Sequence, residues 1–433
     1  MRLNMGKLAA WALLWMGWMP TGVGSPPAPV QAFVGARLID GTGAAPVENA
    51  IILVRDGRIK AVGPKVEIPA GAERIDLKGK TVIPGLINSH GHVGQARGLD
   101  SRPEVNTDDN VLGQLGLYAR YGVTTVFSLG GDREAGFRAR EAQSSGTLDR
   151  ARLYLAGTVI TAATPEEAGN QVQQVAALKP DIIKFRVDDN LGTTAKMPPA
   201  VFQAVIDAAH RQKVRAAAHI FYLEDAKALA RAGVDFLAHS VRDREVDPEL
   251  ISLLKERTLC LCPTLTREVS AFVYDSTPEF FSDPYLRNEA DPAVLAALSS
   301  PERQKAVKNA AAYRRALEVA SANLKKLSDV GLPIAFGTDS GPAGRFQGYF
   351  EHLELELMAK AGLAPMKILV AATSGAARCL GVADSLGSIA PGKWADLVVL
   401  EKDPLADIKN ARAIESVWIA GRRVPGRPAR PTE

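Results

Sequence analysis

Short apolar runs alternate with longer amphipathic stretches through the middle of the chain. The runs are rich in β-branched residues, as buried parallel strands are, and they lie near residues 82, 123, 153, 182, 214, 236, 259 and 333. The stretches between them repeat their apolar residues with the 3.6-residue period of helices. Strands that alternate with helices predict an α/β fold, here a (β/α)8 TIM-like barrel over residues 85–384.

Both ends of the chain carry a different pattern, of short strands separated by tight turns. Residues 33–62 contain two such strands, and Asp56-Gly57 between alternating apolar residues indicates a hairpin. Matching strands recur at residues 395–400 and 416–424. We expect the segments 33–84 and 385–427 to pair into one small β-sandwich domain beside the barrel.

Residues 1–32 are typical of a secretory signal peptide and leader. Arg2 and Lys7 precede an apolar stretch, residues 8–20, that is too short to span a bilayer comfortably. A buried N-terminal helix is the alternative, but the Pro- and Gly-rich residues 20–29 would separate such a helix from the fold. The leader predicts a periplasmic or secreted protein.

Cleavage of the leader is expected after Gly24 or after Ala32, which leaves no stable membrane span. Loss of Arg2 and Lys7 lowers the formal net charge from +4 to +2. So small a charge does not indicate a surface that binds nucleic acid.

The chain has three cysteines, Cys260, Cys262 and Cys379. An odd count, with two of them only two residues apart, does not indicate a disulfide framework. We expect Cys260 and Cys262 to pack in a strand, with a metal role as the lesser alternative.

Four of the six histidines end strand-like runs. His90 and His92 close the apolar run 82–92, and their spacing sends both side chains to one face of a strand. His219 and His239 end two further runs. Neutral imidazole is the commonest metal ligand in proteins, and α/β barrels carry their chemistry where the strands end. The sequence therefore predicts a metal site.

A carboxylate and a lysine lie in equivalent places. Asp339 follows the apolar run 332–338, and it supplies the oxygen donor and base that the histidines lack, although an Asp here can simply cap a turn. Lys184 has apolar neighbours on both faces of its strand, where a bare ammonium is costly. Carbon dioxide can convert a neutral lysine to an anionic carbamate that bridges two metals. The alternative is an ion pair with Asp188 or Asp189.

These residues resemble, in order along the chain, the ligands of the amidohydrolase superfamily, and most closely its imidazolonepropionase-like and prolidase-like branch. That family has His-x-His on the first strand, a lysine on the fourth that is often carboxylated, histidines on the fifth and sixth, and an Asp on the eighth. The resemblance covers residues 33–424, and further matching segments are 122–126, 352–355, 371–377 and 387–397.

The resemblance implies two divalent metal ions, with zinc expected, although manganese, nickel or iron would also suit the ligands. One ion would be held by His90, His92, Asp339 and an N6-carboxylysine at Lys184, and the other by Lys184, His219 and His239. The implied catalytic residues are Asp339, which transfers a proton to the leaving amine, and His239. The implied reaction is hydrolysis by attack of a metal-bridging hydroxide.

Residues near the implied centre are candidates for substrate binding. Arg186 shares a strand face with Lys184 and either holds a substrate carboxylate or pairs with a nearby acid (Asp188, Asp243 or Glu245). The long connection after Cys262 holds an aromatic cluster that includes Tyr274. We expect this cluster, with Tyr274, to line a substrate pocket, and ordinary packing is the alternative.

The sequence thus predicts an exported metal-dependent amidohydrolase that cleaves an amide or dipeptide-type C–N bond in a small-molecule substrate. A single-metal cyclic amidase or deaminase of the imidazolonepropionase type, with Lys184 unmodified, is the alternative enzyme. A non-catalytic metal-binding protein that keeps the fold is the alternative from another class. A homo-oligomer is compatible with the sequence, and the substrate is not identified by it.

Overall fold

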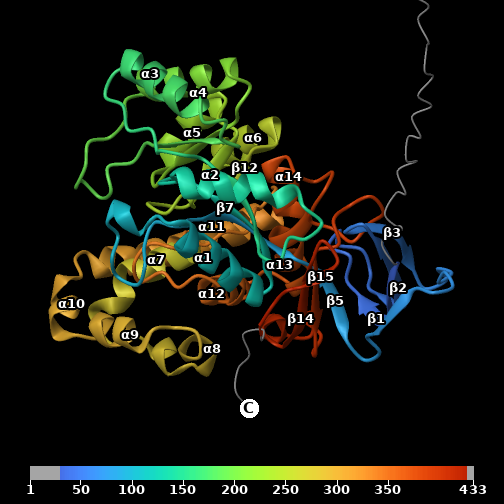
Figure 1. Cartoon of the computed structure of the whole chain (residues 1–433). Coiled ribbons are helices and arrows are strands. Elements are labelled where there is room, and N and C mark those ends of the chain that lie inside the picture. The colour runs from blue at the N-terminus through green and yellow to red at the C-terminus, as the bar shows by residue number, and fades with distance from the viewer. Residues whose placement is uncertain (1–29, 427–433) are drawn as a thin grey trace, which may run out of the picture.

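A computed structural model describes residues 30–426 of the chain (Figure 1). Nearly all of the predicted leader therefore lies outside the described residues. Within residues 30–426, none of the helices combines the length and the apolar character that a membrane crossing requires.

Parallel strands form the centre of the molecule in two sheets. One sheet has the order β6-β7-β8 and the other the order β12-β11-β10-β9. The strands are β6 (Leu86–Gly91), β7 (Val123–Ser128), β8 (Arg152–Leu155), β9 (Ile183–Arg186), β10 (Ala216–His219), β11 (Phe236–Ala238) and β12 (Cys260–Cys262). Helices connect most neighbouring strands in the chain, as parallel pairing requires.

Single parallel bridges continue the hydrogen bonding beyond the edges of both sheets. Ile160, between β8 and β9, pairs with Phe185, and its amide donates to the carbonyl of Lys184 at 2.8 Å. Ile334 pairs with Leu261, and Ser340 pairs with Gly91 on β6. Parallel strands and intervening helices confirm the predicted α/β class, and the closed barrel stays a prediction.

Alternation along each strand separates an inner face from an outer one. On β9, Ile183 and Phe185 pack outward among the residues of the helices, whereas Lys184 and Arg186 lie on the other face.

The helices begin at ordinary capping signals. Thr107 accepts a hydrogen bond from the amide of Asn110 at the start of α1 (Asp108–Arg120), as polar N-caps do. The covering helices include α3 (Pro165–Ala176), α4 (Pro199–Arg211), α5 (Leu223–Ala232) and α6 (Pro248–Arg257).

The two ends of the described chain meet in one eight-stranded sheet. Its order is β15-β14-β13-β5-β1-β2-β3, with β4 beside β1. The N-terminal strands are β1 (Gln31–Leu38), β2 (Val47–Arg55), β3 (Arg58–Gly63), β4 (Glu73–Asp76) and β5 (Thr81–Pro84), and the C-terminal ones are β13 (Leu397–Leu400), β14 (Ile414–Ile419) and β15 (Arg422–Arg423). The expected hairpin is present, and Asp56 and Gly57 both have positive φ, as a tight turn between β2 and β3 requires.

A buried ion pair joins this sheet to the parallel strands. Arg152 on β8 donates to both carboxylate oxygens of Asp396, at 2.9 and 3.2 Å, and both side chains are at most 5% exposed. The guanidinium groups of Arg58 and Arg152 lie 3.6 and 4.4 Å from the centroid of the Trp394 ring. These contacts tie the two parts of the fold together.

A helical insertion follows β12 and covers one side of the molecule, where α8, α9 and α10 project at the lower left of Figure 1. It comprises α7 (Leu265–Phe272), α8 (Pro284–Arg287), α9 (Pro292–Leu298), α10 (Pro301–Ala306) and α11 (Ala310–Asp329). Its aromatic residues pack with Tyr121, Tyr349 and Phe350.

Tyr274 is only 1% exposed and its hydroxyl donates to the carbonyl of Gly344. This arrangement corrects the expected substrate role of Tyr274, because a side chain enclosed by packing offers no surface to a substrate.

The cysteines also require a correction. Cys260 on β12 forms a disulfide with Cys379 on α14 (Ala376–Leu380), 119 residues later. Cys262 is free and buried, as expected for a cysteine packed in a strand. The expectation of no disulfide was wrong. The disulfide forms because α14 packs against the inner face of β12, and a count of cysteines does not reveal that contact.

Candidate metal centre

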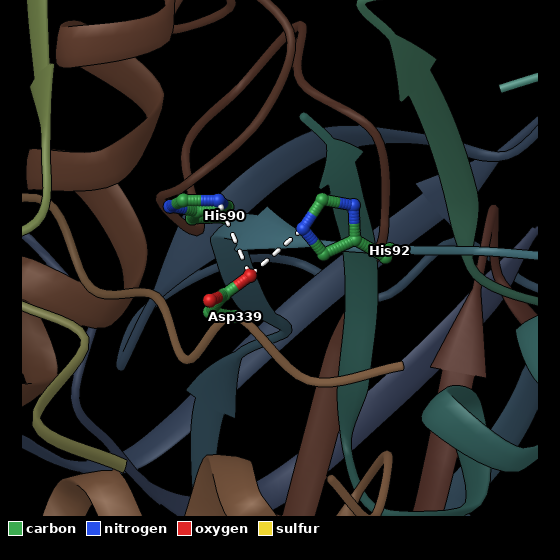
Figure 2. Close-up of side chains that lie close together, drawn as sticks. All are labelled: His90, His92 and Asp339. Atoms are coloured by element: carbon green, nitrogen blue, oxygen red, sulfur yellow. Dashed lines mark hydrogen bonds and ion pairs between the residues drawn. The ribbon is translucent and has the colours of Figure 1, made fainter. Parts of the chain in front are cut away.

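His90, His92 and Asp339 converge where β6 ends (Figure 2). Nε2 of His92 lies 2.8 Å from Oδ1 of Asp339, and Nε2 of His90 lies 3.5 Å from the same oxygen. Donor atoms from all three residues lie within 4.8 Å of one another, and all three residues are buried. Two nitrogens and a carboxylate oxygen at this spacing form a set that a divalent cation can bind.

The backbone around Asp339 turns sharply to present this carboxylate. Asp339 has a φ of 59°, and its amide donates to the carbonyl of His90 at 2.6 Å. Burial alone would raise the pKa of Asp339, but Arg345 and the two histidines hold that pKa well below its usual range. Arg345 donates to Oδ2, so Oδ1 is the oxygen that faces the histidines.

His219 and His239 form a second pair of converging side chains. Nδ1 of His219 lies 2.8 Å from Nε2 of His239, and the rings of His239 and His90 are 4.6 Å apart, so both groups belong to one site. Nε2 of His219 lies 2.8 Å from a carboxylate oxygen of Asp188. In the tautomer with its proton on Nε2, which faces Asp188, His219 keeps a lone pair on Nδ1 directed at His239.

The surroundings keep these imidazoles neutral. Burial lowers the pKa of His219 to about 3, even though Asp188 opposes the shift. Burial likewise lowers the pKa values of His90 and His239 well below the ordinary histidine range, and their basic neighbours add to the effect. Neutral imidazole is the form that binds a metal.

Lys184 lies close enough to both groups to interact electrostatically with His90 and His219, and its amine has no hydrogen-bond partner in the described part of the chain. Its side chain is 3% exposed, and Nζ has no hydrogen-bond acceptor among residues 30–426. The alternative of an ion pair with Asp188 or Asp189 is therefore not what this structure contains. Burial lowers the pKa of Lys184 to about 8, with Asp339 opposing the shift. A neutral, buried amine is the form that can react with carbon dioxide.

The residues present fit a cation. When Nδ1 of His92 donates to the carbonyl of Gly130, at 3.0 Å, the lone pair of Nε2 faces a carboxylate oxygen of Asp339. Nε2 of Gln95 also lies 2.8 Å from Nδ1 of His92, and when it donates there, Nε2 of His92 donates to Asp339 instead. In the first tautomer, the lone pair of His92 and the carboxylate of Asp339 are both free to bind a cation. Thr264, 2.6 Å from Nδ1 of His239, can either donate or accept, and so allows Nε2 of His239 to become a ligand.

Arg186 lies at the mouth of the site with its side chain 32% exposed. Nη2 donates to Asp188 at 3.2 Å, which is one of the two arrangements expected for this arginine. Asp188 is thereby shared between Arg186 and His219. Both partners hold its pKa below the usual range, against the opposing effect of burial.

Sequence reasoning missed two arginines close to the site. Arg345 contacts Asp339, and nothing in the spacing of six residues indicates this contact. Arg242 is 2% exposed, and its Nε lies 2.8 Å from Glu268, also buried. The sequence signal for Arg242 was its position three residues after His239, but a charged residue at such a position is also common on surface loops.

Comparison with known proteins places this geometry in a family. The model of the amidohydrolase family matches residues 81–424. An imidazolonepropionase from Geobacillus kaustophilus is 26% identical over an alignment of 397 positions, and the match covers 82% of this chain and 84% of the relative. The crystal structure of a putative prolidase from Bifidobacterium longum superposes with a TM-score of 0.75 at 26% identity, covering 94% of this chain and 97% of that one. A Xaa-Pro dipeptidase with bound methionine gives a TM-score of 0.74 at 23% identity, over 92% and 100% of the two chains. The chain is a member of the amidohydrolase family.

Proposed function

We propose that this protein is a metal-dependent hydrolase that cleaves amide or dipeptide-type C–N bonds with two divalent metal ions. The observation that carries the proposal is the buried amine of Lys184, which has no hydrogen-bond partner among the residues that the structure describes and lies near both groups of candidate metal ligands. A carbamate on Lys184 would satisfy this position and supply the negative charge that two cations need.

His90, His92 and Asp339 would hold one ion, His219 and His239 the other, and carboxylated Lys184 both. When bound, such ions lower the pKa of water and polarise a carbonyl group. Zinc suits these nitrogen and oxygen donors.

Asp339 and Arg186 supply the remaining steps. The Asp339 carboxylate takes a proton from the attacking water and returns it to the nitrogen of the leaving amine. Arg345 keeps this carboxylate oriented by binding its second oxygen. Arg186, partly exposed at the mouth, is placed to bind a carboxylate of the substrate, and His239 lines the reacting centre.

One relative favours a second candidate, a cyclic amidase or deaminase with one metal and an unmodified Lys184. An imidazolonepropionase matches 82% of this chain. The mass of Lys184 separates the two candidates, because a carbamate adds the mass of carbon dioxide.

The domain organisation and export belong to the same proposal. The parallel strands would close into an eight-stranded barrel, and the sheet of the two chain ends would form the small β-sandwich domain. The buried disulfide supports export, because disulfides persist in oxidising compartments. Cleavage after Ala32 would remove two residues from β1, whereas cleavage after Gly24 leaves β1 intact, so Gly24 is the favoured site.

The proposal is tested by a hydrolysis screen of dipeptides and N-acyl amino acids. Zinc-loaded protein should release amino acid from at least one class, and chelation should abolish the release. The variant Lys184→Ala is the matched control and should be inactive under the same loading. Equal turnover by metal-free and loaded protein would refute the proposal.

A further inference from the structure

A buried carboxylate lies behind the candidate metal centre and takes no part in binding a cation there. Glu351 belongs to α12 (Tyr349–Lys360), the helix that follows the loop after Asp339, and its exposed fraction is 0%. Among residues 30–426 no lysine, arginine or histidine forms an ion pair with it. A buried charge without a cation beside it is expensive unless hydrogen bonds satisfy it.

Four hydrogen bonds satisfy this carboxylate. Oε1 accepts from the amide of Asn88 at 2.7 Å and from the hydroxyls of Thr338 and Ser340, each at 2.6 Å. Oε2 accepts from the backbone amide of Gly348 at 2.6 Å. One carboxylate thereby joins β6, the segment around Asp339 and the start of α12.

The donors to Glu351 are neighbours of the metal-ligand candidates. Asn88 also accepts a hydrogen bond from the amide of His90 at 3.0 Å, through its second polar atom. Thr338 and Ser340 flank Asp339 on both sides, and the amide of Ser340 donates to the hydroxyl of Thr338 at 3.1 Å. The positive φ of Asp339 is a conformation that a non-glycine residue keeps only when its surroundings hold it.

We propose that Glu351 is the positioning residue of this centre: it fixes Asn88, Thr338 and Ser340 so that His90 and Asp339 stay in the geometry that binds a cation. The inference rests on the proposed function only in that the centre binds a divalent metal. Partners of metal ligands typically change metal affinity by about 10- to 100-fold when they are removed.

The chain offers a matched control one turn along the same helix. Glu354 is also a fully buried carboxylate, and it accepts from the amides of Leu265 and Thr266 at 2.8 and 2.7 Å. Neither residue is a proposed ligand, and Glu354 reaches the centre only through them: the hydroxyl of Thr266 also donates to the carbonyl of Thr338 at 2.9 Å. Glu351 binds three neighbours of the ligands directly, so Glu354→Gln should weaken packing to a similar degree but change zinc affinity much less than Glu351→Gln.

The test is a zinc-binding measurement by chelator competition on the full-length wild-type protein, Glu351→Gln and Glu354→Gln. Glu351→Gln is expected to raise the zinc dissociation constant by about 10- to 100-fold, because an amide nitrogen replaces one of the two acceptor oxygens. Glu354→Gln should leave it within about threefold of wild type. With cobalt in place of zinc, the visible absorption band of Glu351→Gln should shift, since the ligand geometry changes.

Ser340→Ala keeps the proposal testable if Glu351→Gln does not fold. It removes the hydrogen bond to Glu351 together with the contact of the same hydroxyl with Tyr118 at 2.7 Å, and it should raise the zinc dissociation constant by about fivefold, as for the loss of about one ordinary hydrogen bond. Unchanged zinc affinity in a folded Glu351→Gln or Ser340→Ala protein would overturn the positioning role. Hydrolysis is measured separately: a wild type that binds zinc but cleaves no substrate refutes the proposed function, and the zinc comparison still decides the role of Glu351.

Discussion

The disulfide between Cys260 and Cys379 gives a prediction whose magnitude follows from the structure. The link closes a loop of 119 residues, and both cysteines are buried. Closing a loop of this length removes chain entropy from the unfolded state that corresponds to about 5 kcal/mol at 298 K. The double variant Cys260→Ala/Cys379→Ala should therefore lose about 5 kcal/mol in free energy of unfolding.

Urea unfolding followed by tryptophan fluorescence measures this loss. The matched control is Cys262→Ala, which removes a buried thiol from the same strand without opening a loop and should cost only about 1 kcal/mol. Thiol titration of denatured, unreduced wild-type protein should find one free thiol. Three free thiols, or a double variant as stable as Cys262→Ala, would refute the reasoning.

Three further predictions concern stability and processing. Asp396→Asn leaves Arg152 buried without its partner, so the free energy of unfolding in urea should fall by about 3–5 kcal/mol, and a loss under 1 kcal/mol would contradict the bridging role. Burial raises the pKa of Glu354 to about 7 from 4.5, so the folded state binds more protons between these values and stability falls as pH rises from 4.5 to 7, by about 3 kcal/mol. Glu354→Gln should not show this fall in stability between pH 4.5 and 7. An identical pH dependence of stability in the wild type and in Glu354→Gln would refute the assignment to Glu354. N-terminal sequencing of protein from its native cell should begin at Ser25, and an intact Met1 would exclude export by cleavage.

The ligand residues were visible in the sequence because strand geometry is local. A period of two places His90 and His92 on one face, and parallel strands deliver their C-terminal ends to a common edge, which brings in His219 and His239. The family resemblance linked these residues to Lys184. The structure then places them together and shows the amine to be buried and unpartnered.

Other features could not be predicted because they depend on segments that meet only in the folded chain. The bonds of Glu351 require α12 to begin directly behind β6, and the disulfide requires α14 to reach β12. Tyr274 was expected to bind substrate because aromatic residues in a long connection can line a pocket as readily as they can pack in a core. Its neighbours across the insertion, which decide in favour of packing, are far away in sequence.

The central claim is that Lys184 joins two metal-binding groups into one centre. The most direct test is the metal content per chain, measured by elemental analysis on purified wild-type protein and on Lys184→Arg, which stays cationic and cannot form a carbamate. The account predicts about two equivalents of divalent metal in the wild type and a large loss in Lys184→Arg. Equal metal content in the two proteins would contradict the bridging role of Lys184, and a wild type that is fully active without metal would contradict the whole account.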